Sequence, residues 1–237
     1  MPDIWKTWGV SIVGPHHRKE NIPNQDAWLS GGFKGGMSLA VSDGLGSKPF
    51  SDTGSKAACL SVIEAGKIYK QHADGKYIFL PELIHALWTL KTGALNPNDC
   101  AATCLFAVQI NEKITLGRLG DGMVIAAGKN QCVVMEDPKT DSFINMTDCL
   151  GDSYKAGEWD VRVIPADDFE TIILCTDGVA NDINPEKTCE FALSLFECYK
   201  TMDRKKRSRE IAKWLREWPE PDDKTLACLF KEDSRDA

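Results

Sequence analysis

Short apolar runs, each bounded by turn residues, constrain the fold of this chain more than any other feature. Val, Ile, Leu and Thr dominate these runs, which is typical of β-strands. The runs in "LFAVQINEKITLGRL" meet at Asn111-Glu112, so they predict a hairpin and antiparallel pairing. The predicted strands are 8–14, 37–42, 103–110, 113–120, 123–128, 131–136, 160–165, 171–176 and 225–230.

Longer stretches with helical spacing lie between groups of these strands. They are 53–71, the segments that follow Pro81 and Pro185, and 208–218. Proline is tolerated in the first turn of a helix, where its missing N–H has no intrahelical partner. Because helices arrive in pairs between groups of strands, we expect an α+β fold with helical layers outside antiparallel sheets.

Length and composition favour one soluble domain. The chain has 237 residues, 43% of them hydrophobic, with no Pro/Gly/Ser linker or internal repeat. We therefore expect a single domain over 1–237. The N-terminus lacks the features of a signal peptide, and no apolar run approaches the roughly 18 residues that span a bilayer. A cytoplasmic protein without membrane contact is expected.

The charge of the chain argues against nucleic-acid binding. The formal net charge is −7, whereas nucleic-acid binding requires a basic face. The one basic cluster, "RKKRSR" at 204–209, is interpreted as a solvated loop and helix face rather than a phosphate or membrane patch.

Nine cysteines are many for a cytoplasmic chain. Their number is odd, no C-x-x-C pair occurs, and most lie in apolar runs such as "AATCLFAV". We interpret them as small buried hydrophobic residues rather than as disulfides or zinc ligands.

Aspartates recur at the ends of predicted strands. They are Asp26, Asp43, Asp121, Asp177 and Asp222, the last followed by Asp223. Asp-Gly is a common turn dipeptide, so these could be unrelated turns. If they converged, their mutual repulsion would call for a divalent cation such as Mg²⁺ or Mn²⁺, which carboxylate oxygens bind well. Spacing alone leaves both interpretations open.

These motifs, in this order along the chain, resemble those of the metal-dependent serine/threonine protein phosphatases of type 2C. The matching segments are "NQDA" (24–27), "VSDGLGS" (41–47), "AATCLFAV" (101–108), "LGDG" (119–122), "LCTDGVAND" (174–182) and "DDKTLACLF" (222–230). The resemblance implies an antiparallel β-sandwich flanked on both faces by helix pairs, a four-layer α/β/β/α architecture.

The resemblance also implies a centre of two Mn²⁺ or Mg²⁺ ions. Asp43 would bridge the two ions, and the Gly44 carbonyl would bind one. Asp177 and Asp222 would be direct ligands and, with Asp43, the catalytic residues. Asp26 would act mainly through water, and Asp121 would hold a possible weak third ion.

The implied activity is hydrolysis of phosphoserine and phosphothreonine in proteins. A metal-bridging hydroxide would attack phosphorus without a covalent intermediate. The protein would be a monomer that reverses the action of a partner Ser/Thr kinase.

Departures from the family pattern leave alternatives open. Leu45 stands where many members have histidine, and Asn181 replaces an acidic residue. Asn21 occupies the position of a phosphate-binding arginine, which leaves Arg18, Lys19 or His16 as candidates for that role. The alternatives are a non-catalytic regulatory or binding module on the same fold, or a phosphatase of small phosphoesters.

Overall fold

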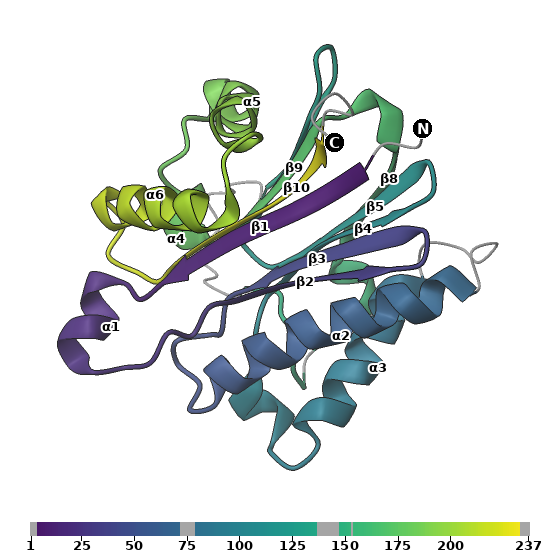
Figure 1. The fold of residues 1–237 in the computed structure, drawn as a ribbon. Helices are drawn as coiled ribbons and strands as arrows, with labels where there is room; N and C mark the ends of the chain where they lie inside the picture. The colour runs from purple at the N-terminus through teal and green to yellow at the C-terminus, as the bar shows by residue number, and fades with distance from the viewer. Residues whose placement is uncertain (1–3, 72–78, 137–146, 153, 233–237) are drawn as a thin grey trace.

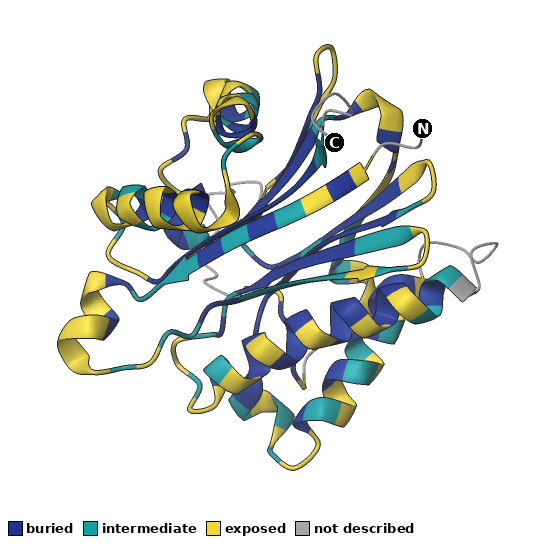
Figure 2. Ribbon diagram, in the orientation of Figure 1, coloured by how far each residue is buried: buried dark blue, intermediate teal, exposed yellow. Residues whose placement is uncertain are grey.

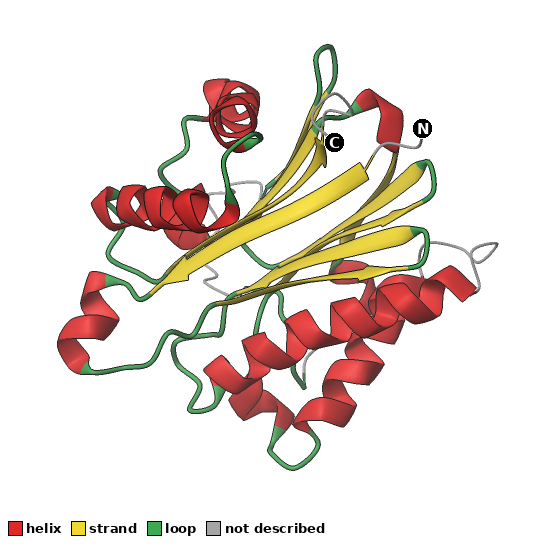
Figure 3. Cartoon of the chain, in the orientation of Figure 1, coloured by secondary structure: helices red, strands yellow, loops and turns green. Residues whose placement is uncertain are grey.

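The computed structural model describes residues 4–71, 79–136, 147–152 and 154–232. In these residues two five-stranded antiparallel sheets face each other, and helices cover both outer faces (Figure 1, Figure 3). The predicted α+β sandwich with four layers is therefore confirmed.

The first sheet joins the two ends of the described chain. Its order is β1-β10-β9-β6-β7. Ile4 pairs with Glu232 and Ile12 with Lys224, so β1 and β10 are paired along their whole length. The strands are β1 (Ile4–Ile12), β10 (Lys224–Glu232), β9 (Thr171–Cys175), β6 (Met123–Ala127) and β7 (Cys132–Met135).

The second sheet is a meander completed by β8, in the order β2-β3-β4-β5-β8. Asn111, at a φ of 52°, turns the predicted hairpin between β4 and β5. Sequence patterning missed β2, whose Ser30-Gly31-Gly32 segment lacks strand-forming residues. The strands are β2 (Ala27–Phe33), β3 (Gly36–Ser42), β4 (Cys104–Ile110), β5 (Lys113–Leu119) and β8 (Asp160–Pro165).

Buried apolar residues form three clusters between the layers. Figure 2 shows that buried residues run along the strands and alternate with exposed ones on the helices. Leu39, Leu105 and Leu174 belong to the cluster between the sheets. The other two clusters lie under the helices. The long helices are α2 (Ser51–Gln71) and α3 (Phe79–Thr92) on the second sheet, and α5 (Thr188–Tyr199) and α6 (Arg204–Glu217) on the first. No helix in the described ranges is long and apolar enough to cross a membrane.

Two short helices adjoin the ends of strands. The first, α1 (Pro15–Glu20), follows β1, and the second, α4 (Asp177–Ala180), follows β9. The basic cluster forms the start of α6, where most of it is exposed as expected, but Arg207 is buried.

A disulfide between Cys132 of β7 and Cys189 of α5 corrects the expectation of unpaired cysteines. The described free cysteines are buried, as predicted, apart from Cys198. The bonded pair is 57 residues apart in sequence. No local spacing could reveal it, because the packing of α5 on the first sheet brings the two residues together.

Candidate metal centre

The strand-end aspartates converge at one end of the sandwich. Asp43 follows β3, Asp177 follows β9, and Asp121 lies between β5 and β6. Asp26 precedes β2, whose first residue pairs with the last of β3. Asp222 precedes β10, whose start pairs with the end of β9. Antiparallel pairing therefore brings the beginnings and ends of these strands to the same edge.

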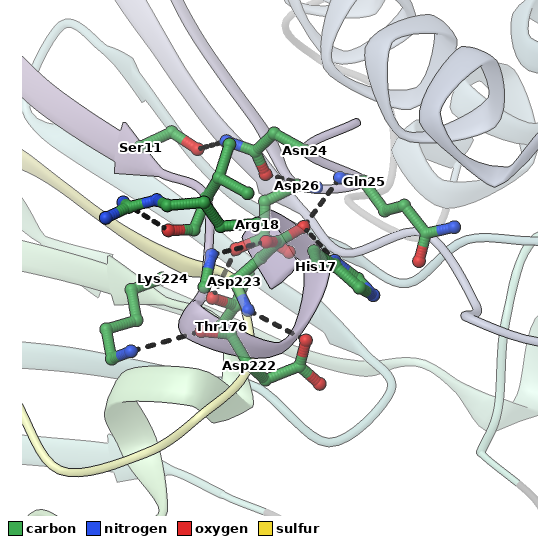
Figure 4. Close-up of polar contacts among 12 residues, drawn as sticks. Ser11, His17, Arg18, Asn24, Gln25, Asp26, Thr176, Asp222, Asp223 and Lys224 are labelled. Carbon is green, nitrogen blue, oxygen red and sulfur yellow. Dashed lines mark hydrogen bonds and ion pairs between the residues drawn. The ribbon is translucent and has the colours of Figure 1, made fainter. Parts of the chain in front are cut away.

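Asp26 is buried among polar groups. Thr176 donates its hydroxyl to Asp26 Oδ2 at 2.8 Å, and the Asp26 backbone N–H donates to Asn24 Oδ1 at 3.0 Å (Figure 4). Burial raises the pKa of Asp26 to about 7, although hydrogen bonds from Asp43 and Thr176 lower it. In the metal-free protein this carboxyl group therefore keeps its proton to a higher pH than an ordinary aspartate does.

Asp43 is held through its backbone by Thr103. The Asp43 N–H donates to Thr103 Oγ1 at 2.9 Å, and its carbonyl accepts from the Thr103 N–H at 2.8 Å. Burial, followed by the negative charges of Asp26 and Asp177, raises the pKa of Asp43 well above its ordinary value. These carboxylates are close enough to repel one another strongly.

Gly44 lies in a position that excludes a side chain. A Cβ atom there would be 2.5 Å from the carbonyl oxygen of Ser51. The Gly44 N–H donates to the Gln25 carbonyl at 3.1 Å, which ties the turn after β3 to the segment before β2. A glycine here allows the turn after β3 to pack closely against the start of α2.

Asp121, Asp177 and Asp222 complete the group. Burial raises the pKa of Asp177 to about 6, and the charges of Asp121 and Asp222 contribute. Thr147 donates to Asp121 Oδ2 at 3.1 Å, whereas the buried Oδ1 has no hydrogen-bond partner in the described chain. Asp222 is exposed and accepts the Asp223 N–H at 2.7 Å.

This arrangement fits hard divalent cations. It supplies carboxylate oxygens from the ends of several strands, burial and then mutual repulsion raise their pKa values, and one buried oxygen lacks a donor in the described chain. Mn²⁺ and Mg²⁺ bind such oxygens and would offset the negative charge. The donor set requires no thiolate or imidazole.

Sequence reasoning missed the structural role of Asp223 and all of His17. Both are buried, and Asp223 accepts the Gly14 N–H at Oδ1 and the Gln25 N–H at Oδ2, each at 2.7 Å. His17 Nδ1 lies 3.0 Å from Oδ2, at ion-pair distance but without a well-aligned hydrogen bond (Figure 4). The second Asp of "PDDKT" was visible in the sequence, but nothing local pointed to His17.

His17, Asp222 and Asp223 also bring potential ligand atoms within 4.8 Å of one another. Asp223 is nevertheless better suited to support than to metal binding, because backbone N–H groups occupy both of its oxygens. Asp222, by contrast, has an exposed carboxylate next to Asp223, so it is better placed to bind a metal ion.

Lys224 is a buried cation next to the centre that the sequence did not indicate. Its Nζ donates to the Asp222 carbonyl at 3.1 Å (Figure 4). Burial lowers its pKa, while Glu220 and Asp222 act in the opposite direction. Lys224 therefore offsets part of the negative charge on the Asp222 side.

The candidate phosphate-binding residues lie on α1 and are exposed. Arg18 Nη2 donates to the Val13 carbonyl at 3.1 Å, and its side chain extends away from the Asp222 carboxylate in Figure 4. It lines an open cavity of about 550 Å³ with Asn21 and Arg216. No contact joins Lys19 to the carboxylates in the described residues.

Asp182 does not take the place of the acidic residue that Asn181 replaces. Its Oδ2 accepts the Glu220 N–H at 3.2 Å. Asn181 caps α4, and its N–H donates to the Asp177 carbonyl. Both positions are therefore engaged in local backbone contacts.

Comparison of the sequence with protein families matches residues 13–216 to the model described as protein phosphatase 2C. No curated protein sequence matches the chain significantly.

Solved bacterial structures share the fold over nearly the whole chain. A bacterial serine phosphatase is 14% identical with a TM-score of 0.72, covering 98% of this chain and 100% of its own. The serine/threonine phosphatase Stp1 from Staphylococcus aureus has the same identity and TM-score, covering 98% and 97%. That of S. agalactiae is 12% identical with a TM-score of 0.67, covering 97% and 100%. At these identities the likeness establishes the fold alone.

Proposed function

This chain belongs to the protein phosphatase 2C family, and on that premise we propose that it hydrolyses phosphoserine and phosphothreonine esters in proteins. The observation that carries the proposal is the convergence of Asp26, Asp43, Asp121 and Asp177 at the sheet edge where Asp222 precedes β10. Its substrates would be phosphoproteins modified by a partner Ser/Thr kinase.

The residues have distinct proposed roles. Asp43, Asp177 and Asp222 would be direct ligands of two Mn²⁺ or Mg²⁺ ions, assisted by the Gly44 carbonyl. Asp26 would orient water, and Asp121 would hold a weak third ion. When bound, such ions supply a nucleophile from water near neutral pH and offset charge on the phosphoryl group. Thr103 and Thr176 would keep Asp43 and Asp26 in place.

We also propose that residues 1–237 act as one monomeric catalytic domain in the cytoplasm. The full-length pairing of β1 with β10 supports a single unit, because it joins segments from both ends of the described chain.

A specific observation keeps the binding-module alternative in view. Arg18 is engaged with Val13 rather than with the carboxylates, and Asn21 supplies no cation. If no other group binds the phosphate, the fold could serve recognition without turnover.

Turnover assays separate these functions. We expect release of p-nitrophenol from p-nitrophenyl phosphate, and of phosphate from phosphothreonine peptides, with Mn²⁺ but not with EDTA. Asp43→Asn and Asp177→Asn should each lower kcat by about a hundredfold or more, since each removes a metal-binding charge.

Asp52→Asn is the matched control, because Asp52 is a carboxylate at the start of α2 that pairs with Lys56. Its activity should equal that of the wild type. If Mn²⁺ stimulated turnover of neither substrate, the phosphatase proposal would be wrong and the non-catalytic binding module would be the remaining function. Turnover of the small ester without any phosphopeptide would favour a phosphatase of small phosphoesters.

A further inference from the structure

A second cavity lies at the opposite end of the first sheet from the carboxylates. It has a volume of about 690 Å³, and Trp5, Lys6, Arg204, Arg207 and Phe230 contribute to its lining. At about 3.4 Å per residue, Phe230 lies ~20 Å along β10 from Lys224. In Figure 1 the start of β1 and its end beside α1 mark these two ends of the sheet.

Arg207 is a buried cation in this lining, with 9% of its surface exposed. Its Nη2 donates to the Met202 carbonyl at 2.7 Å, and the guanidinium lies 5.3 Å from the centre of the Phe230 ring. Its Nε is buried without a hydrogen-bond partner. Because a buried charge needs compensation, this guanidinium is under-satisfied without an anion.

The charges around Arg207 add to this need. Within the described residues no carboxylate forms an ion pair with Arg207, although Asp203 lies near enough to influence it. Asp203 is the N-cap of α6 and accepts the N–H groups of Lys205 and Lys206. The first turn of α6 contains no acidic residue and begins with Arg204. Cations at a helix N-terminus oppose the helix dipole, so a bound anion would be favourable there.

The cavity also has an apolar part, and its lining includes the carboxylates of Asp203 and Glu232. Trp5, Met37 and Phe230 line it alongside the cations. Glu232 is paired with Lys6 on the same wall, so its charge is already offset. A volume of this size suits a small organic ligand.

We infer that this cavity binds a small organic anion, with a carboxylate, sulfonate or phosphate group on an aromatic or other apolar body. The anionic group would lie between Arg204 and Arg207, and the apolar part against Trp5, Met37 and Phe230. The site is separate from the metal centre, so the ligand would bind without displacing a phosphorylated substrate.

The test uses anilinonaphthalene sulfonate as the probe and follows its fluorescence on titration with the full chain. We expect one saturable site, with affinity lowered about tenfold in Arg204→Glu, because this change replaces a cation with an anion at the mouth of the cavity. Arg209→Glu makes the same charge change on the same helix at an exposed position outside the lining, and it should bind the probe normally.

Arg207→Gln should weaken binding further, and its melting temperature must be measured because the residue is buried. Arg204→Glu, at an exposed position, keeps the test decisive if Arg207→Gln unfolds. Equal affinities of Arg204→Glu and Arg209→Glu would overturn the inference. So would equally tight binding of the neutral phenylnaphthylamine, which would indicate a purely apolar patch.

Two further arms locate the site and identify the anionic group. Asp43→Asn should bind the probe normally, and loss of binding there would place the probe at the metal centre and refute the inference. Displacement by phenyl phosphate or by benzoate, without displacement by inorganic phosphate, would support an organic anion and show which group is preferred. If neither phenyl phosphate nor benzoate displaced the probe, the inference of an organic-anion site would be overturned.

Discussion

Nδ1 of His17 lies 3.0 Å from Oδ2 of Asp223, and both side chains are buried. The same carboxylate accepts the backbone N–H groups of Gly14 and Gln25. One aspartate at the start of β10 therefore holds the end of β1, the helix α1 and the residue that precedes Asp26. Asp223 thus supports the candidate metal centre through the backbone.

Asp223→Ala should lower both stability and metal affinity. It leaves two backbone N–H groups without their acceptor and removes the carboxylate beside His17, so we expect the free energy of unfolding to fall by about 2–4 kcal/mol. Because the segment before Asp26 loses its anchor, Mn²⁺ affinity should fall about tenfold. Urea unfolding and calorimetric titration with Mn²⁺ measure the two effects.

Asp182→Ala provides the matched control, since Asp182 accepts a single N–H at an exposed position. It should cost about 1 kcal/mol or less. If both variants behaved alike, Asp223 would not have the supporting role assigned to it.

The stability of the metal-free protein should fall as pH rises from about 4 to about 7. Burial raises the pKa of Asp26 to about 7 and that of Asp177 to about 6, from an unfolded value of 3.8. Between these limits the folded state binds more protons than the unfolded state, so the free energy of unfolding decreases with pH.

Mn²⁺ should reverse this trend, because it binds the deprotonated carboxylates. The increase in melting temperature on adding excess Mn²⁺ should therefore be larger at about pH 8 than at about pH 5. Scanning calorimetry with and without the metal measures this difference. An Mn²⁺ effect independent of pH would argue against binding at these aspartates.

Asp43→Asn should make the metal-free protein more stable at neutral pH while abolishing stabilisation by Mn²⁺. The amide removes a carboxyl group whose charged form is disfavoured by burial and by the charges of Asp26 and Asp177, so the free energy of unfolding should rise. Thermal unfolding with and without Mn²⁺ gives both quantities. A variant that is destabilised without metal would show that the Asp43 carboxylate supports the fold rather than straining it.

Removing the disulfide should destabilise the chain without affecting the carboxylates. Cys132→Ser with Cys189→Ser opens a loop of 57 residues, for which chain entropy predicts a loss of up to about 4 kcal/mol. Urea unfolding of this double variant, compared with the oxidised wild type, measures the loss, and the reduced wild type should match the double variant. Cys198→Ser, at an exposed free cysteine, should leave stability unchanged.

The sequence by itself determined the antiparallel class and the candidate aspartates. Alternating apolar runs and turn residues encode strands locally, and the hairpin at Asn111 needs no distant partner. Asp43 and Asp177 could be selected because each follows a predicted strand, and the order of the motifs resembles one family. The same local pattern missed β2, because two glycines weaken its strand signal. This strand is held in place by pairing with β3 and by contact with α2.

Tertiary structure alone decided which of these groups meet. The pairing of β1 with β10 brings His17 to Asp223, and the packing of α5 on the first sheet brings Cys189 to Cys132. The packing of α6 also buries Arg207, although the sequence predicts that the whole basic segment 204–209 is solvated. Such contacts join residues far apart in sequence, so they depend on strand register and layer packing, which no local pattern of residues records.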